Sequence, residues 1–119
     1  MEIENLCTSP LNIEICLKIA NNDKTIAKKL ISMFVKDLPS SQQEINTSFK
    51  NNDIVSLKKQ IHKLLGASAY CGAEDIQTTL NALSVSIEDN NKAGIEKAIK
   101  LLNENIRTIL DFYREDTLI

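Results

Sequence analysis

The spacing of apolar residues most constrains how this chain folds. They follow a helical period in five segments, and the connections between the segments are short and polar. Apolar side chains three and four residues apart lie on one face of a helix, and short connections make consecutive helices antiparallel neighbours. We therefore expect an all-α fold, an antiparallel up-down-up-down four-helix bundle with a short N-terminal capping helix.

The expected helices cover about residues 10–20, 24–50, 54–70, 73–88 and 92–114, so the bundle itself covers about 24–114. In the first helix, Ser9 is the expected N-cap and Pro10 the first helical residue. The apolar stripes predict a buried set made of Ile13, Cys16, Leu17, Ala20, Ile26, Leu30, Met33, Phe34, Leu38, Ile45, Phe49, Ile54, Leu57, Ile61, Leu64, Leu65, Ile76, Leu80, Leu83, Ile87, Ile95, Ile99, Leu102, Ile106, Ile109 and Tyr113.

Three residues punctuate the longer helices. Pro39 has no backbone N–H to donate, so we expect a kink or a short break near Leu38. Asp53 is the expected N-cap of the third helix. Gly72 suits a left-handed position at the end of that helix.

Length and composition narrow the class of protein. A chain of 119 residues fits one domain, 1–119, and its net charge of −2 and its few aromatic residues exclude an ordinary nucleic-acid binder. Without a bilayer-spanning apolar segment or a signal peptide, we expect a cytoplasmic domain that makes no membrane contact. Three cysteines without a CxxC pair indicate free thiols, and the single histidine excludes a His-rich metal site.

That histidine, His62, lies off the predicted core face of its helix. Successive helical residues turn by about 100°, which places His62 about 100° from Ile61 and on the solvent-facing shoulder. Val55, Gly66 and Ala69 lie at nearly the same angle about the helix axis. Glycine within a helix costs about 1 kcal/mol relative to alanine, so Gly66 indicates a close approach by another protein.

Lysines surround this histidine. Lys59 lies three residues before His62 and Lys63 directly after it, whereas Lys58 lies nearer the core edge. An exposed imidazole with open access and nearby cations suits nucleophilic attack on a phosphoryl group. The alternative is a surface histidine without a role, a glycine that serves helix packing and lysines that only solvate the face.

The segment 61–73, IHKLLGASAYCGA, resembles the signature of histidine-containing phosphotransfer (HPt) domains. That signature is a histidine followed by an apolar residue at i+2, glycine at i+4, small residues and a glycine ten residues on. The resemblance extends over about residues 24–113. The ending Tyr70-Cys71-Gly72 looks most like the C-terminal HPt domain of BarA/GacS-type hybrid sensor histidine kinases.

The resemblance implies that His62 accepts a phosphoryl group from the aspartyl-phosphate of a receiver domain and passes it to another receiver. Gly66 matches the access glycine of the family, and with Ala69 and Val55 it would form the receiver-docking face. Many members carry a lysine at i+3, where this chain has Leu65, so Lys63 and Lys59 would stabilise the phosphate. The chain would need no cofactor or metal, because Mg²⁺ would belong to the receiver.

A glycine-rich phosphate loop is absent, so we expect a phosphotransfer carrier without an ATP site. It would be a monomer, either free-standing or the cytoplasmic end of a membrane-bound hybrid kinase. A different class of function, a non-catalytic helical adaptor with an incidental His62, stays open. A small catalytic bundle is disfavoured because no second titratable group can be placed beside His62. Gln42, Gln43 and Ser84 could approach its helix, but the sequence does not place them.

Overall fold

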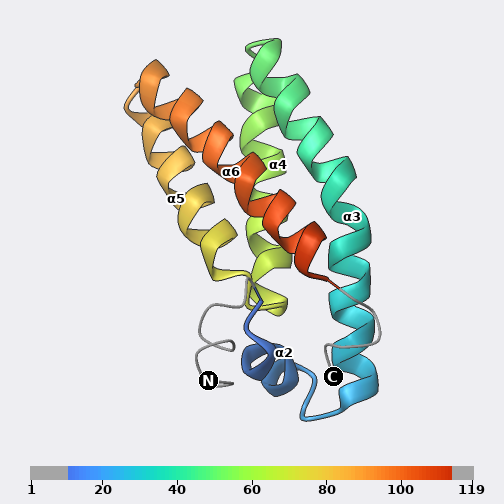
Figure 1. The fold of residues 1–119 in the computed structure, drawn as a ribbon. Coiled ribbons are helices and arrows are strands. Elements are labelled where there is room, and N and C mark those ends of the chain that lie inside the picture. The colour runs from blue at the N-terminus through green and yellow to red at the C-terminus, as the bar shows by residue number, and fades with distance from the viewer. Residues whose placement is uncertain (1–10, 114–119) are drawn as a thin grey trace.

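The computed structural model describes residues 11–113, and these contain five helices and no strand. The helices are α2 (Ile13–Ile19), α3 (Lys24–Lys50), α4 (Ile54–Tyr70), α5 (Glu74–Glu88) and α6 (Lys92–Phe112). Helices α3 to α6 run alternately up and down, and each packs on the next, with α6 returning to α3 (Figure 1). The predicted four-helix bundle is confirmed.

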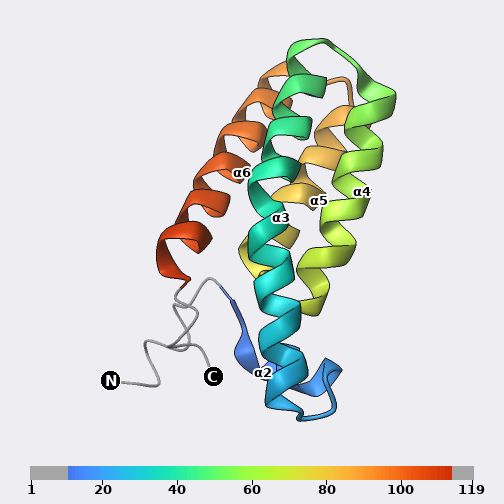
Figure 2. The ribbon, with the colours of Figure 1, turned by 90° about the vertical axis from the view of Figure 1, so that its right-hand side faces the viewer.

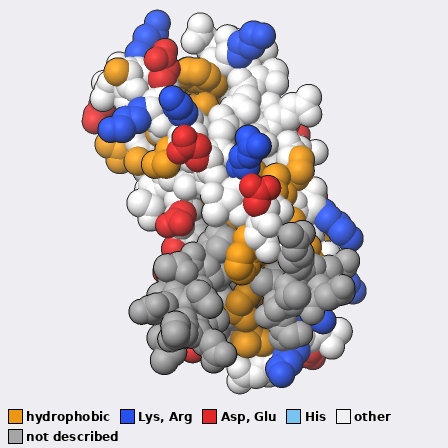
Figure 3. Space-filling model, viewed as in Figure 1, with side chains coloured by type: hydrophobic (Ala, Val, Ile, Leu, Met, Phe, Trp, Pro, Cys, Tyr) orange, Lys and Arg blue, Asp and Glu red, His pale blue; other side chains and the backbone are white. Residues whose placement is uncertain are grey.

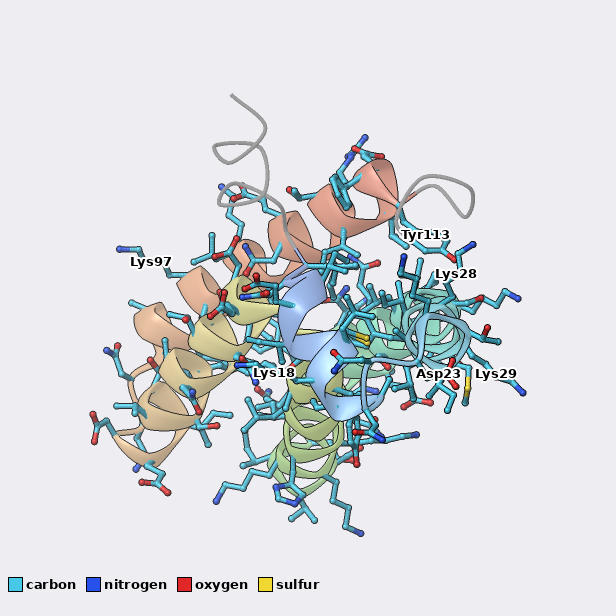
Figure 4. All side chains as sticks on the ribbon, turned by 90° about the horizontal axis from the view of Figure 1, so that it is seen from below. Lys18, Asp23, Lys28, Lys29, Lys97 and Tyr113 are labelled. Atoms are coloured by element: carbon cyan, nitrogen blue, oxygen red, sulfur yellow. The ribbon has the colours of Figure 1, made fainter. Side chains whose placement is uncertain are left out.

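Helix α2 lies across one end of the bundle, where it packs against α3 and α4 (Figure 4). Its N-cap is Asn12, whose side chain accepts a hydrogen bond from the backbone N–H of Ile15, so the helix begins at Ile13 and not at the expected Pro10. Ser9 and Pro10 lie outside the described residues. The backbone N–H of Asn12 also donates to the carbonyl of Gly72 at 2.9 Å, which fixes the capping helix to the end of α4.

Helix α3 has 27 residues and runs beyond the bundle to meet α2 (Figure 2). It continues through Pro39 without the short break that the sequence allowed, although the ribbon bends in its middle part. Proline removes one backbone hydrogen bond, but the burial of Leu38 and Ile45 fixes the helix before and after it. The structure therefore has the expected kink and not the break.

Polar residues at the turns fix the lengths of the helices. Asp53 caps α4 as predicted, because its carboxylate accepts a hydrogen bond from the backbone N–H of Ser56 at 3.1 Å. Gly72 has the predicted left-handed backbone, with φ of 62°. Helix α5 begins one residue later than expected, after Ala73, and α6 ends at Phe112 and not at residue 114.

The core is aliphatic, and most of the predicted apolar stripes are buried in it. Three members of the predicted set are wrong: Ile26, Met33 and Ile54 are 47%, 57% and 40% exposed. In α3 the buried stripe passes instead through Ala27, which allows α2 to approach closely. Ile54 is the first residue of α4, at the end of the bundle opposite α2 (Figure 1). No helix within residues 11–113 is long and apolar enough to cross a membrane.

Candidate functional site

His62 lies in the middle of α4, and its side chain is exposed. Ile61 and Leu64 are each 3% exposed and fix the rotation of the helix about its axis. Because these two residues face the core, the histidine one position after Ile61 faces solvent. The angular position of His62 on its helix, as expected from the sequence, matches this exposure.

The surface on the C-terminal side of His62 is low. Gly66 is exposed, and a Cβ atom added to it would meet no other atom within 4 Å. Packing within the described part of the chain therefore does not require a glycine there, which removes the alternative that Gly66 serves helix packing. Val55 and Ala69 are also exposed on α4.

A surface hollow of about 210 Å³ lies beside His62, between α4 and α5. From α4 it is lined by Lys58 and Leu65 as well as the histidine, and from α5 by Ser84 and Glu88. The structure thus brings Ser84 to His62, a placement that the sequence left open. Spacing alone gives no signal for it, because the rotation of α5 against α4 depends on packing.

Lys63 lies on the other side of α4, where it lines a separate hollow of about 300 Å³ between α3 and α4. Asp37 and Glu44 of α3 line that same hollow. Lys59 is exposed on α4. The two lysines that the sequence assigned to the phosphate therefore lie near His62, but neither lines its hollow.

Gln42 and Gln43, the other polar neighbours considered from the sequence, do not line the hollow at His62. The amide of Gln42 donates to the side-chain oxygen of Asn103 on α6 at 2.9 Å. Gln43 lines a third hollow, with Gln60 of α4. Neither side chain therefore shares the hollow with the histidine.

Helix α4 is positively charged although the whole chain has a net charge of −2. It contains three lysines and no acidic residue. By contrast, positive and negative side chains are mixed on the face viewed in Figure 3, which includes α5 and α6. The exposed side of α4 therefore suits an anionic ligand or an acidic partner.

The two described cysteines are buried free thiols. The Sγ atoms of Cys16 and Cys71 contact the backbone carbonyls of Ala27 and Leu30, each at 3.6 Å. Burial, followed by the neighbouring Cys16, raises the pKa of the Cys71 thiol to about 12. Neither residue presents a thiolate nucleophile at neutral pH. Cys7 lies outside the described residues.

Comparison with known proteins agrees with this geometry. A profile of the Hpt domain matches residues 29–111, and the chain belongs to this family. It is 25% identical over 74 residues to the sensor protein GacS of Pseudomonas syringae pv. syringae, an alignment that spans 62% of this chain and 8% of GacS. The family resemblance stated from the sequence is confirmed.

A solved structure shares the fold. The HPt domain of a sensor hybrid histidine kinase from Shewanella superposes with a TM-score of 0.68 and is 25% identical, over 87% of this chain and 92% of that domain. Hpt domains are phosphotransfer carriers of two-component phosphorelays, and they interact with receiver domains. Membership of the family therefore places this chain in that class of signalling protein.

Proposed function

We propose that His62 is the residue that carries the phosphoryl group, accepting it from the aspartyl-phosphate of one receiver domain and passing it to another. One observation carries the proposal. His62 is the only histidine in the chain, it lies within the region that matches the family, and it is exposed next to the open surface at Gly66.

The chemistry needs a nucleophile and access, and α4 supplies both. The lone pair of an imidazole nitrogen forms a P–N bond while the P–O bond to the receiver aspartate breaks, and the carboxylate leaves with its electron pair. Transfer to the second receiver reverses these changes at a new aspartate. The Mg²⁺ ion that neutralises the transferring group belongs to the receiver, and this chain supplies no cofactor.

The receiver docks on the exposed face of α4. Gly66 leaves room for the approach, and Val55 and Ala69 give small or apolar contacts on either side of His62. Lys59 and Lys63 provide the positive field that draws the acidic active site of a receiver to this helix. A single copy of the chain is sufficient, so we propose that it acts as a monomer.

The chain spans about 8% of the curated relative's length. We place it as the phosphotransfer domain of a hybrid sensor kinase or as a free-standing carrier. The neighbouring coding sequence separates the two arrangements, because a transmitter and a receiver in the same reading frame identify a kinase domain.

The direct test is transfer of labelled phosphate from receiver domains that have been phosphorylated with acetyl phosphate. We expect the chain to gain phosphate that is labile in acid, and phosphoramidate to label the same residue. A helical adaptor would bind a receiver and gain none. Absence of label from both kinds of donor would overturn the proposal.

A further inference from the structure

We propose that the phosphoryl group on His62 occupies the hollow between α4 and α5, where Lys58 and Ser84 contact it. This assignment rests on the proposed function of His62. The chain has Leu65 at i+3, where many members of the family carry a lysine. In this assignment Lys58, from the preceding turn, supplies the cation instead, and Ser84 of the neighbouring helix supplies a hydroxyl.

The position of Lys58 favours this role. It is four residues before His62, which places it one turn earlier on the same side of α4. Side chains on a helix lean toward its N-terminus, so the imidazole lies over the turn that holds Lys58. Both residues line the 210 Å³ hollow, and Lys58 has no ion-pair partner among residues 11–113. Its ammonium group is therefore free to meet a phosphate.

The hydroxyl of Ser84 is also available. A serine or threonine in a helix often donates back to a backbone carbonyl in the preceding turn. Ser68 and Thr108 do so here, to Leu65 and Glu104. Ser84 makes no such bond, and its hydroxyl has no partner within the described part of the chain. It faces the hollow beside His62 as an unused donor.

Glu88 gives the hollow an opposing charge. It lies one turn after Ser84 on α5 and lines the same hollow. Lys58 and Glu88 are the charged groups that line this hollow, whereas Lys59 and Lys63 lie outside it. A carboxylate near the phosphate destabilises the dianion, which favours onward transfer over storage.

The pKa of phosphohistidine reports these contacts without a receiver. The protein is labelled with phosphoramidate, and the ³¹P chemical shift of phosphohistidine is titrated across the neutral range. A nearby cation or hydrogen-bond donor lowers the midpoint, and a nearby anion raises it. We expect Lys58→Gln and Ser84→Ala each to raise the midpoint, and Glu88→Gln to lower it, by about 0.2 to 0.7 of a pH unit.

Three matched variants control the titration. Lys58→Arg and Ser84→Thr keep the charge and the hydroxyl, and we expect wild-type midpoints. Lys97→Gln makes the same change of charge on α6, at a side chain that extends into solvent away from the bundle (Figure 4), and we also expect no shift.

The outcomes separate this assignment from the proposed function. If His62 is labelled but the titration midpoint is unchanged in Lys58→Gln and Ser84→Ala, the phosphoryl group does not occupy this hollow. The carrier function then remains intact. Equal shifts in Lys58→Gln and Lys97→Gln would overturn it too, because they would report only the total charge. A wild-type protein that accepts phosphate neither from phosphoramidate nor from a phosphorylated receiver contradicts the carrier function itself.

Discussion

His62 and Gly66 lie one helical turn apart on the exposed face of α4, and a Cβ at Gly66 would meet no atom within 4 Å. The glycine therefore costs helix stability that no packing contact in the described chain recovers. Its absent side chain leaves space beside the imidazole. That space is open to a molecule that approaches from outside.

Filling this space should block transfer and leave the fold intact. We expect Gly66→Leu to keep or raise the free energy of unfolding, since glycine is the poorer helix former by about 1 kcal/mol. Receiver binding and phosphotransfer should fall sharply. Gly66→Ala is the matched control, with a similar gain in helix propensity and a much smaller obstruction. Undiminished transfer in Gly66→Leu would show that the receiver does not approach over this glycine.

Lys59 and Lys63, which lie outside the hollow, should act on the receiver through their electrostatic field. Exposed charge pairs contribute at most about 1 kcal/mol, and salt screens them. We expect the double variant Lys59→Gln/Lys63→Gln to slow transfer by no more than about tenfold per lost interaction, at 1.4 kcal/mol per decade. The effect should shrink at high ionic strength. A complete loss of transfer that salt does not alter would instead indicate specific buried contacts with the receiver.

Gly72 holds the capping helix, and here an added methyl group should destabilise the fold. The backbone φ is +62°, and a Cβ would lie 2.6 Å from the Cβ of Asn12. We expect Gly72→Ala to lower the free energy of unfolding by at least about 2 kcal/mol. The same substitution at Gly66 should stabilise, so thermal melts of the two variants should shift in opposite directions. A melting temperature unchanged in Gly72→Ala would argue against this contact between Asn12 and the end of α4.

The buried thiol of Cys71 makes stability depend on alkaline pH. Its pKa is raised to about 12 in the folded chain, so the unfolded chain loses this proton first as pH rises. The contribution is fully present below the ordinary thiol pKa and is lost as pH rises toward the folded value. We expect denaturant unfolding to show stability falling on the alkaline side, with a shallower fall in Cys71→Ala. Equal slopes in the two proteins would contradict the shift.

The fold could be predicted because its signals are local. Helical spacing defined the five segments, and Asp53 and Gly72 marked a beginning and an end that the structure repeats. The errors arose where tertiary packing chose between adjacent residues. Ala27 has little hydrophobic signal, yet it is buried and Ile26 is not, because only a small residue allows α2 to approach so closely.

The candidate site was predictable on one helix and not across two. The bearing of His62 and the gap at Gly66 follow from the geometry of α4 alone. The positions of Ser84 and Glu88 depend on how α5 is rotated against α4, which no spacing within either segment fixes. For the same reason the sequence ranked Lys63 above Lys58, although Lys58 shares the hollow with the histidine.

The carrier function depends on His62 being a surface nucleophile, and His62→Gln tests this most directly. Transfer of labelled phosphate from a phosphorylated receiver and thermal melting are measured on the same sample. We expect no transfer to the variant and a loss of stability under about 0.5 kcal/mol, as is usual for an exposed position. Transfer at the wild-type level would contradict the assignment of His62, and a large loss of stability would show that its side chain belongs to the core.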